Sequence, residues 1–228
     1  MNHLGRLDRL ANSYSVMRHG QSKANLRGVI ISRIEADASG DYGLTELGRE
    51  QVRAAALPYP LRSRRGLPCL PPAGSPPASS LEAGTPPSGA LPAGALVFSS
   101  DFARAAQTAD IMRARLAAPD VVIAPALRER CFGDWDGTPT ANYRKVWAAD
   151  EAGHADDGVE PAFAVLDRVT AFIVDLEGQH SRRDILLVSH GDTLQILQAG
   201  FARIDPARHR RLPHLETAEI RRLHLAPL

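Results

Sequence analysis

The sequence predicts an α/β fold: a three-layer α/β/α sandwich with a mostly parallel central sheet. Three observations support this class. Short apolar runs of strand length alternate along the chain with longer segments whose apolar residues recur at helical spacing. Of the 228 residues, 44% are hydrophobic and 23% are charged, which is typical of a globular domain. No stretch approaches the ~20 apolar residues that a membrane-spanning helix requires.

The strands are expected where short apolar runs end in polar residues. Residues 13–18 (SYSVMR) form the first, and residues 184–189 (DILLVS) are the clearest buried strand. Residues 95–99 and 121–124 are two further short runs. Residues 218–225 alternate between polar and apolar side chains, which suits a strand at the edge of a sheet.

The helices are expected where apolar residues recur every three to four positions, at residues 44–57, 101–117, 140–149, 161–177 and 193–201. In the first, Thr45 is the predicted N-cap, and Leu47 and Val52 belong to the predicted apolar face. In the second, Asp101 is the predicted N-cap and Pro119 follows the end. Alternation of these helices with the strands predicts helices on both faces of the sheet.

One segment differs from the rest in composition. Residues 61–94 hold eight of the 17 prolines, together with five glycines. Proline lacks a backbone donor and glycine adds chain entropy, so this stretch favours neither a regular helix nor a central strand. We therefore expect a single domain over residues 1–228 with an insertion loop at about 61–94. Its removal is expected to leave the core and the activity largely intact.

Charge and cysteine content exclude several classes of protein. The formal net charge is +1, which gives no electrostatic basis for a general nucleic-acid binder. The two cysteines form no CxxC pair, so neither a disulfide scaffold nor a cysteine zinc site is expected. The first residues contain no apolar signal-like core. We expect a soluble cytoplasmic protein without nucleic-acid or membrane partners, and a homodimer stays open.

Chemically active side chains follow four of the predicted strands. Arg18 and His19 end the first, Arg104 lies in the helix after the second, Glu129 follows the third and His190 follows the fourth. Ligands of such sheets bind outside the carboxyl ends of the strands, so these groups should meet there. Each histidine precedes a glycine, which permits a sharp turn and close approach of a ligand.

This set of groups suits phosphoryl transfer through a histidine. Two guanidinium groups can hold the non-bridging oxygens of a phosphate monoester in fixed geometry. A neutral imidazole is a competent nucleophile that needs no metal, and a second imidazole can donate a hydrogen bond to the phosphoryl group. A carboxylic acid can protonate the departing alkoxide and later, as a carboxylate, activate water. We therefore expect no metal and no cofactor.

Five segments, in order along the chain, resemble signature elements of the histidine phosphatase superfamily, which includes the cofactor-dependent phosphoglycerate mutases. They are RHGQSKAN (residues 18–25), LTELGREQ (44–51), SSDFARAAQTA (99–109), LRERCFGDWDG (127–137) and VSHG (188–191). Residues 61–94 lie outside these matches, and residues 29–41 match the family's substrate-contacting segment poorly.

The resemblance implies a phosphoglycerate mutase-like fold and a phosphohistidine mechanism. In it His19 is the nucleophile, Glu129 is the proton donor, and the phosphate pocket is completed by Arg18, Arg104 and His190. It also implies substrate contacts, for which the candidates are Ser22, Asn25 and Gly191. The expected substrate is a small phosphomonoester.

Alternatives stay open at this level. Glu129 and His190 are 61 positions apart, which resembles the phosphatase branch rather than the mutases with their longer segment. Mutase-type phosphotransfer and a non-catalytic phosphate-binding module are the alternatives.

Several other residues have two readings. The basic run at residues 208–211 and the following His214 suggest a solvated face or contact with an anionic substrate. Asp192 and Gln195 could orient His190 or line the pocket. For the rest, Asp134 and Asp136 are expected to set a turn rather than to catalyse, and Cys131 is expected to be a small core residue.

Overall fold

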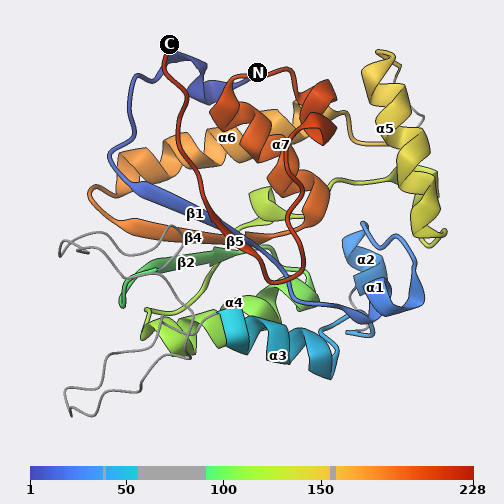
Figure 1. Cartoon of the computed structure of the whole chain (residues 1–228), viewed down its shortest axis with the longest axis horizontal. Coiled ribbons are helices and arrows are strands. Elements are labelled where there is room, and N and C mark those ends of the chain that lie inside the picture. The colour runs from blue at the N-terminus through green and yellow to red at the C-terminus, as the bar shows by residue number, and fades with distance from the viewer. Residues whose placement is uncertain (38–39, 56–90, 155–157) are drawn as a thin grey trace, which may run out of the picture.

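A computed structural model of the chain describes residues 1–37, 40–55, 91–154 and 158–228. Its centre is a five-stranded sheet of order β3-β2-β4-β1-β5 (Figure 1). The strands are β1 (Ser13–Arg18), β2 (Leu96–Ser99), β3 (Val122–Ile123), β4 (Asp184–Ser189) and β5 (Ile220–Arg222). The sheet is parallel except for β5, which pairs antiparallel with β1 at one edge. The predicted mostly parallel sheet is confirmed.

The register places the ends of β1, β2 and β4 side by side. Arg18 of β1 lies opposite Ser189 of β4, and Ser99 of β2 lies opposite Val188. β4 is central, and its residues from Ile185 to Ser189 are fully buried. A strand covered on both faces needs apolar side chains on both, which explains the continuous apolar run in its sequence.

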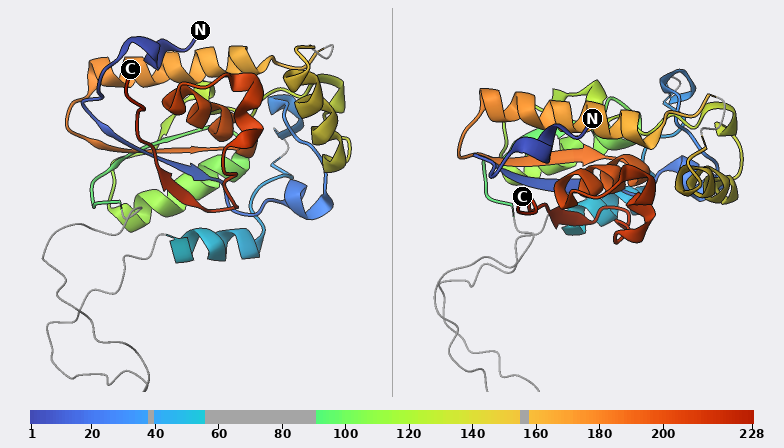
Figure 2. Two further views of the ribbon diagram at one scale, coloured as in Figure 1. Left: turned by 45° about the horizontal axis from the view of Figure 1, so that its top comes forward. Right: turned by 90° about the horizontal axis from the view of Figure 1, so that it is seen from above.

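Helices cover both faces of the sheet (Figure 2). One face carries α6 (Ala162–Gln179) and α7 (Gly191–Ala202), and the other carries α3 (Glu46–Ala55) and α4 (Ala103–Leu116). Alternate residues of the strands pack into two apolar cores, one on each face of the sheet. Val16 and Leu187 pack with the first pair, while Met17 and Leu186 pack with the second pair. This is the predicted three-layer α/β/α arrangement.

A smaller group of elements lies beyond the carboxyl ends of β1 and β4, at the right of Figure 1. It contains α1 (Lys23–Arg27), α2 (Ile34–Asp37) and α5 (Tyr143–Glu151), the latter preceded by the 3-10 turn η4 (Thr140–Asn142). The remaining 3-10 turns are η1 (His3–Arg6), η2 (Pro125–Leu127), η3 (Gly133–Trp135) and η5 (Pro206–Arg211). Ile30, Phe132, Val146 and Val159 form a separate apolar cluster under this group.

Several sequence expectations need correction. The first predicted helix spans residues 46–55, and residues 56 and 57 lie outside the described part of the chain. Leu47 is 50% exposed, so it does not belong to the buried face of that helix. Of the predicted insertion loop, residues 61–90 lie outside the described residues, and residues 91–94 lead directly into β2. Cys131 is half-buried rather than a core residue.

The N-cap of α4 is also different from the predicted one. Asp101 forms an ion pair with Arg128 at 2.5 Å and does not cap the helix. The amide of Ala103 instead donates to the carboxylate of Asp37 at 2.5 Å, from a segment 66 positions away. Asp101 is thus engaged by Arg128, and the distant carboxylate of Asp37 takes the place of the local N-cap.

No helix among the described residues has both the length and the apolar character needed to span a bilayer.

Candidate active site

The predicted site residues meet at one cavity of about 280 Å³ at the carboxyl ends of the strands. Its lining includes Arg18, Ser22, Asn25, Arg104, Glu129 and Gly191, together with His19. His190 lies directly against this group, because its ring contacts the His19 ring edge to face, with centroids 5.2 Å apart. The topology therefore brings together residues that are spread over more than 170 positions of sequence.

The imidazole of His19 is held in one tautomer. Its Nδ1 lies 2.8 Å from the carbonyl oxygen of Gly20, and a carbonyl can only accept, so Nδ1 carries the proton. Arg104 donates from Nε to Nε2 of His19 at 3.3 Å, which requires a lone pair on Nε2. Burial, then the charges of Arg104 and Arg18, hold the pKa of His19 well below its usual range. The ring is therefore neutral, with its free lone pair on Nε2.

The loop after His19 is braced by α3. A Cβ atom on Gly20 would lie 2.5 Å from the carbonyl oxygen of Gly48, and a Cβ on Gly48 would lie 2.0 Å from that of Gln21. Glycine at both positions permits this close approach of two backbones. Gln51 accepts from the Gln21 amide at 2.9 Å, and Thr45 donates to the Gln21 carbonyl at 3.2 Å. The LTELGREQ segment thus fixes the backbone that carries His19.

Arg104 is positioned by a partner that the sequence did not indicate. Its guanidinium lies 3.5 Å from the carboxylate of Asp37, and both side chains are buried. It also donates to the carbonyl of Ile31 at 2.9 Å and lies over the ring of Phe102, 4.6 Å from its centroid. Asp37, which also caps α4, had no recognisable local signal, because its role depends on a helix far along the chain.

Two buried nitrogen atoms on this side of the cavity, Nε of Arg18 and Nδ1 of His190, have no hydrogen-bond partner among the described residues, and Nη1 of Arg104 has only the Asp37 carboxylate at 3.5 Å. The other nitrogen of His190 pairs with the hydroxyl of Ser100 at 2.9 Å. Burial, then the charge of Arg104, lowers the pKa of His190 well below its usual range. Unpaired buried donors are costly, so their convergence indicates a place for an anion that accepts from them.

Glu129 is a buried carboxyl group with a raised pKa. It is 8% exposed, and its Oε1 accepts from the amides of Arg130 and Thr193 at 2.9 and 3.2 Å. The Thr193 hydroxyl lies 3.1 Å from Oε1 and 2.9 Å from the carbonyl oxygen of Arg128, with one proton for the two. Burial, then the charge of Asp192, raises the pKa of Glu129 against the opposing charge of Arg104. The two amide donors on Oε1 leave Oε2 as the oxygen that would carry the proton of the acid form.

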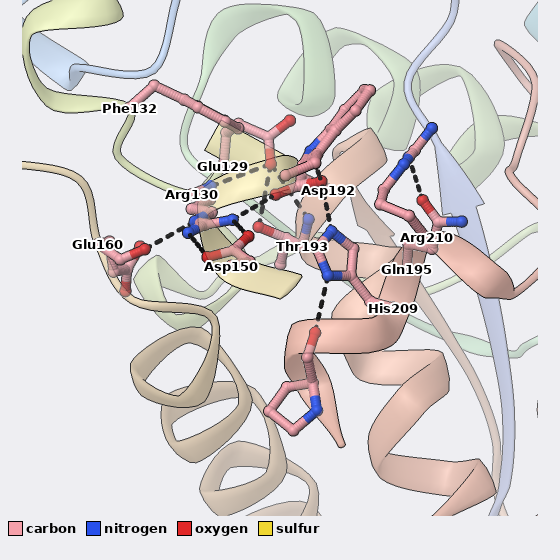
Figure 3. A network of polar contacts seen from close by, with 12 residues as sticks. Glu129, Arg130, Phe132, Asp150, Glu160, Asp192, Thr193, Gln195, His209 and Arg210 are labelled. Carbon is pink, nitrogen blue, oxygen red and sulfur yellow. Dashed lines mark hydrogen bonds and ion pairs between the residues drawn. The ribbon is translucent and has the colours of Figure 1, made fainter. Parts of the chain in front are cut away.

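Asp192 stays ionised beside Glu129 because a buried network holds it (Figure 3). Trp147 and His209 bind its Oδ1 at 2.9 and 3.0 Å, and Arg130 lies 3.3 Å from its Oδ2. Burial alone would raise the pKa of Asp192, but the His209 hydrogen bond and the charges of His209, Arg130 and Arg210 outweigh it and lower the pKa. Asp192 lines the cavity, and the ring of His190 is bound by Ser100 instead.

The wall opposite the strands contains Tyr143 and Trp147, which were not predicted as site residues, and two residues for which contact with an anionic substrate was one of two predictions, Arg210 and His214. Tyr143 and Trp147 of α5 stack with their planes 7° apart, and the guanidinium of Arg210 lies 3.7 Å from the Trp147 ring centroid. His214 completes this wall. The reading of the basic run as a solvated face is therefore wrong for Arg210, and its neighbour His209 is fully buried.

Ser22 and Asn25 line the cavity but also hold α1 in place. The amide of Asn25 donates to the Ser22 hydroxyl at 3.2 Å, and the amide of Ser22 donates to the Asn25 side chain at 2.9 Å, a reciprocal cap. Asp136 accepts from the Ser32 hydroxyl at 2.8 Å and so joins two loops, while Asp134 is 92% exposed. Both aspartates lie outside the lining of the cavity.

The described residues contain no group of three or more metal-ligating side chains suited to a metal ion.

Comparison with known proteins gives a family and a fold. A model of the histidine phosphatase superfamily (branch 1) matches residues 90–227. The matched range begins after the RHGQSKAN and LTELGREQ segments. No curated protein matches the sequence.

Solved structures resemble the chain over most of its length. A mycobacterial glucosyl-3-phosphoglycerate phosphatase is 24% identical, with a TM-score of 0.65 over 92% of this chain and 88% of that one. Bacillus stearothermophilus YhfR is 20% identical, with a TM-score of 0.68 over 95% and 96%. A putative alpha-ribazole-5'-P phosphatase from Escherichia coli is 24% identical, with a TM-score of 0.61 over 92% and 89%. At these identities the likeness establishes the fold.

Proposed function

The chain belongs to the histidine phosphatase superfamily, and from this premise we propose that it hydrolyses phosphomonoesters through a phosphohistidine on His19. One observation carries the proposal. A neutral imidazole with its Nε2 lone pair free of a proton lies beside the guanidinium of Arg104 and the unpaired buried nitrogen atoms of Arg18 and His190. This arrangement pairs a nucleophile with a cationic receptor for the group that it attacks.

In the first step, Nε2 of His19 attacks the phosphorus atom and the ester P–O bond breaks. Arg18, Arg104 and the Nδ1–H of His190 donate to the non-bridging oxygens and offset their charge. Glu129, whose pKa is raised by burial and by Asp192, gives its proton to the departing oxygen, so that an alcohol leaves rather than an alkoxide.

In the second step, water attacks the phosphorus atom of phosphohistidine and the N–P bond breaks. Glu129, now a carboxylate, takes the proton of the attacking water. His19 leaves as the neutral ring in which it began, with Nδ1–H still directed at the Gly20 carbonyl. Inorganic phosphate dissociates and the site is restored without a metal or a cofactor.

Two facts favour hydrolysis over mutase-type transfer. Glu129 and His190 are 61 positions apart, a short segment that contains α5 and α6. Two of the structures that resemble the chain are described as phosphatases, for glucosyl-3-phosphoglycerate and for alpha-ribazole-5'-P.

The test is to trap the phosphoenzyme with a radiolabelled phosphomonoester. The wild-type protein should yield base-stable, acid-labile label and release inorganic phosphate, with EDTA leaving the rate unchanged. His19→Ala should abolish both the label and the turnover. The matched control is His224→Ala, since His224 is exposed and outside the cavity.

Retained label in His19→Ala would contradict the assignment of the nucleophile. Transfer of the label to a second substrate molecule, with no release of phosphate, would replace hydrolysis by mutase activity. Binding of phosphate without any label would indicate a phosphate-binding module instead of an enzyme.

A further inference from the structure

Arg210 is a cation in the cavity that the proposed reaction does not use. It comes from η5, lines the same cavity as His19, and its guanidinium lies over the Trp147 ring, 3.7 Å from the ring centroid. The amide oxygen of Gln195 accepts from its Nη1 and so holds the guanidinium in place. Within the described part of the chain, no carboxylate lies at ion-pair distance from Arg210.

The nearest acidic group of the cavity wall is already neutralised. Asp192 pairs with Arg130 at 3.3 Å and with His209 at 3.0 Å, and its remaining acceptor capacity is taken by Trp147. The positive charge of Arg210 therefore remains available to the contents of the cavity. A guanidinium that is half-buried, fixed and unpaired is suited to an anionic ligand.

The contact between Arg210 and His214 also indicates a missing acceptor. Arg18 donates from Nη1 to Nε2 of His214 at 2.8 Å, so the lone pair of that ring is on Nε2. Burial and the charges of Arg18 and Arg210 lower the pKa of His214, which keeps the ring neutral with its proton on Nδ1. That Nδ1–H faces Nη1 of Arg210 at 3.5 Å, and both groups are donors.

Two donors that face each other repel, unless an acceptor binds both. An anionic oxygen near Nη1 of Arg210 and Nδ1 of His214 would satisfy them together. The place is distinct from the phosphoryl pocket, because the His214 ring separates Arg210 from Arg18. It lies within the same cavity and so within reach of the leaving group of a bound ester.

We propose that Arg210 and His214 bind a second anionic group, a carboxylate or a phosphate, on the leaving group of the phosphomonoester substrate. The inference rests on the proposed function, since it assigns the substrate class of the same cavity. Trp147 contributes by holding the guanidinium face, and Gln195 by fixing its edge. Neutral leaving groups should bind the phosphoryl pocket alone.

The first test is equilibrium binding of phosphonates, which carry no hydrolysable ester bond. Calorimetry would compare propylphosphonate with 2-carboxyethylphosphonate and with ethylene-1,2-bisphosphonate. A charge-assisted hydrogen bond predicts a preference of roughly 10- to 100-fold for one or both of the doubly anionic compounds. The compound that shows the preference identifies the second anion as carboxylate or phosphate.

The variant Arg210→Met keeps an unbranched side chain on Trp147 and should remove the preference. Arg208→Met is the matched control, because Arg208 lies in the same turn but is exposed and outside the cavity. It should retain both the preference and the turnover of p-nitrophenyl phosphate. Melting curves of both variants would verify that each is folded.

Two outcomes overturn this inference: equal affinities of the wild-type protein for all three phosphonates, or a preference that survives in Arg210→Met. Either result, with p-nitrophenyl phosphate still hydrolysed, would leave the proposed function standing. A preference that Arg210→Met removes, in a protein without phosphatase activity, would support the anion site and contradict the proposed function.

Discussion

The exchange Glu129→Gln tests the proposed acid with little disturbance of its surroundings. Oε1 of Glu129 accepts from the amides of Arg130 and Thr193, and the oxygen of a glutamine side chain can accept the same two bonds. The amide nitrogen then occupies the place of Oε2. The variant keeps the shape and the hydrogen bonds of the buried group and loses the transferable proton.

The expected penalty depends on the leaving group. An alkoxide is a poor leaving group, so an alkyl phosphate should lose roughly 10²- to 10⁴-fold in the rate of phosphoenzyme formation, the usual contribution of general acid catalysis. The phenolate of p-nitrophenyl phosphate leaves without protonation. With that ester His19 should still be phosphorylated, and the phosphoenzyme should accumulate because the base for water is missing.

Rapid-quench measurement of labelled protein, with both esters, decides the matter. An equal loss for the alkyl and the aryl ester would refute the assignment of Glu129 as the acid. The proton would then have to come from another group, because Asp192, the other carboxylate of the cavity, is held ionised.

The same variant has a predicted effect on stability. Burial raises the pKa of Glu129 in the folded protein, so the unfolded chain loses this proton at lower pH than the folded one. Glu129 therefore favours folding fully below the ordinary glutamate pKa, and this contribution declines as pH rises toward the folded pKa. Relative to wild type, the melting temperature of Glu129→Gln should rise as the pH increases above the ordinary glutamate pKa of about 4. A constant difference would contradict the raised pKa.

Two further perturbations follow from packing. Arg130 is 1% exposed and compensates two buried carboxylates, so Arg130→Met should cost about 3–5 kcal/mol in urea unfolding; a loss under about 1 kcal/mol would mean that the pairs contribute little. A methyl group on Gly48 would lie 2.0 Å from the Gln21 carbonyl, so Gly48→Ala should lower both the melting temperature and kcat/KM. Gly178 lies in a helix with open space around it, so Gly178→Ala should instead stabilise the folded protein by roughly 0.5–1 kcal/mol and leave kcat/KM unchanged. A similar outcome for both exchanges would refute the proposed close contact between Gly48 and the loop after His19.

Local patterns predicted the elements of the fold because their causes are local. The apolar run at residues 184–189 became the central strand β4, and helical spacing located α4, α6 and α7 to within a few residues. Ligands of a parallel sheet bind outside the carboxyl ends of its strands, so the sequence predicted that His19, Glu129 and His190 lie at one edge of the sheet. Their positions in the structure follow from the register of β1 beside β4.

The wall of the cavity was not accessible to this reasoning. Arg210 is one residue of a basic run, and nothing in that run distinguishes it from the exposed Arg208 and Arg211. What selects it is the ring of Trp147, which is brought into contact by the packing of α5 against η5. A contact between residues 63 positions apart depends on the whole intervening chain, whereas periodicity reports only neighbours in sequence.

The sequence by itself determined the α/β class and the order of strands and helices along the chain, because these depend on hydrogen bonding and burial within single elements. Tertiary structure alone decided that Asp37, rather than Asp101, caps α4 and pairs with Arg104. A buried arginine needs a carboxylate within a few ångströms. The sequence does not show which of its acidic residues supplies that carboxylate. Only the folded chain brings one particular carboxylate into that range, because electrostatic and hydrogen-bond energies depend on distance in space.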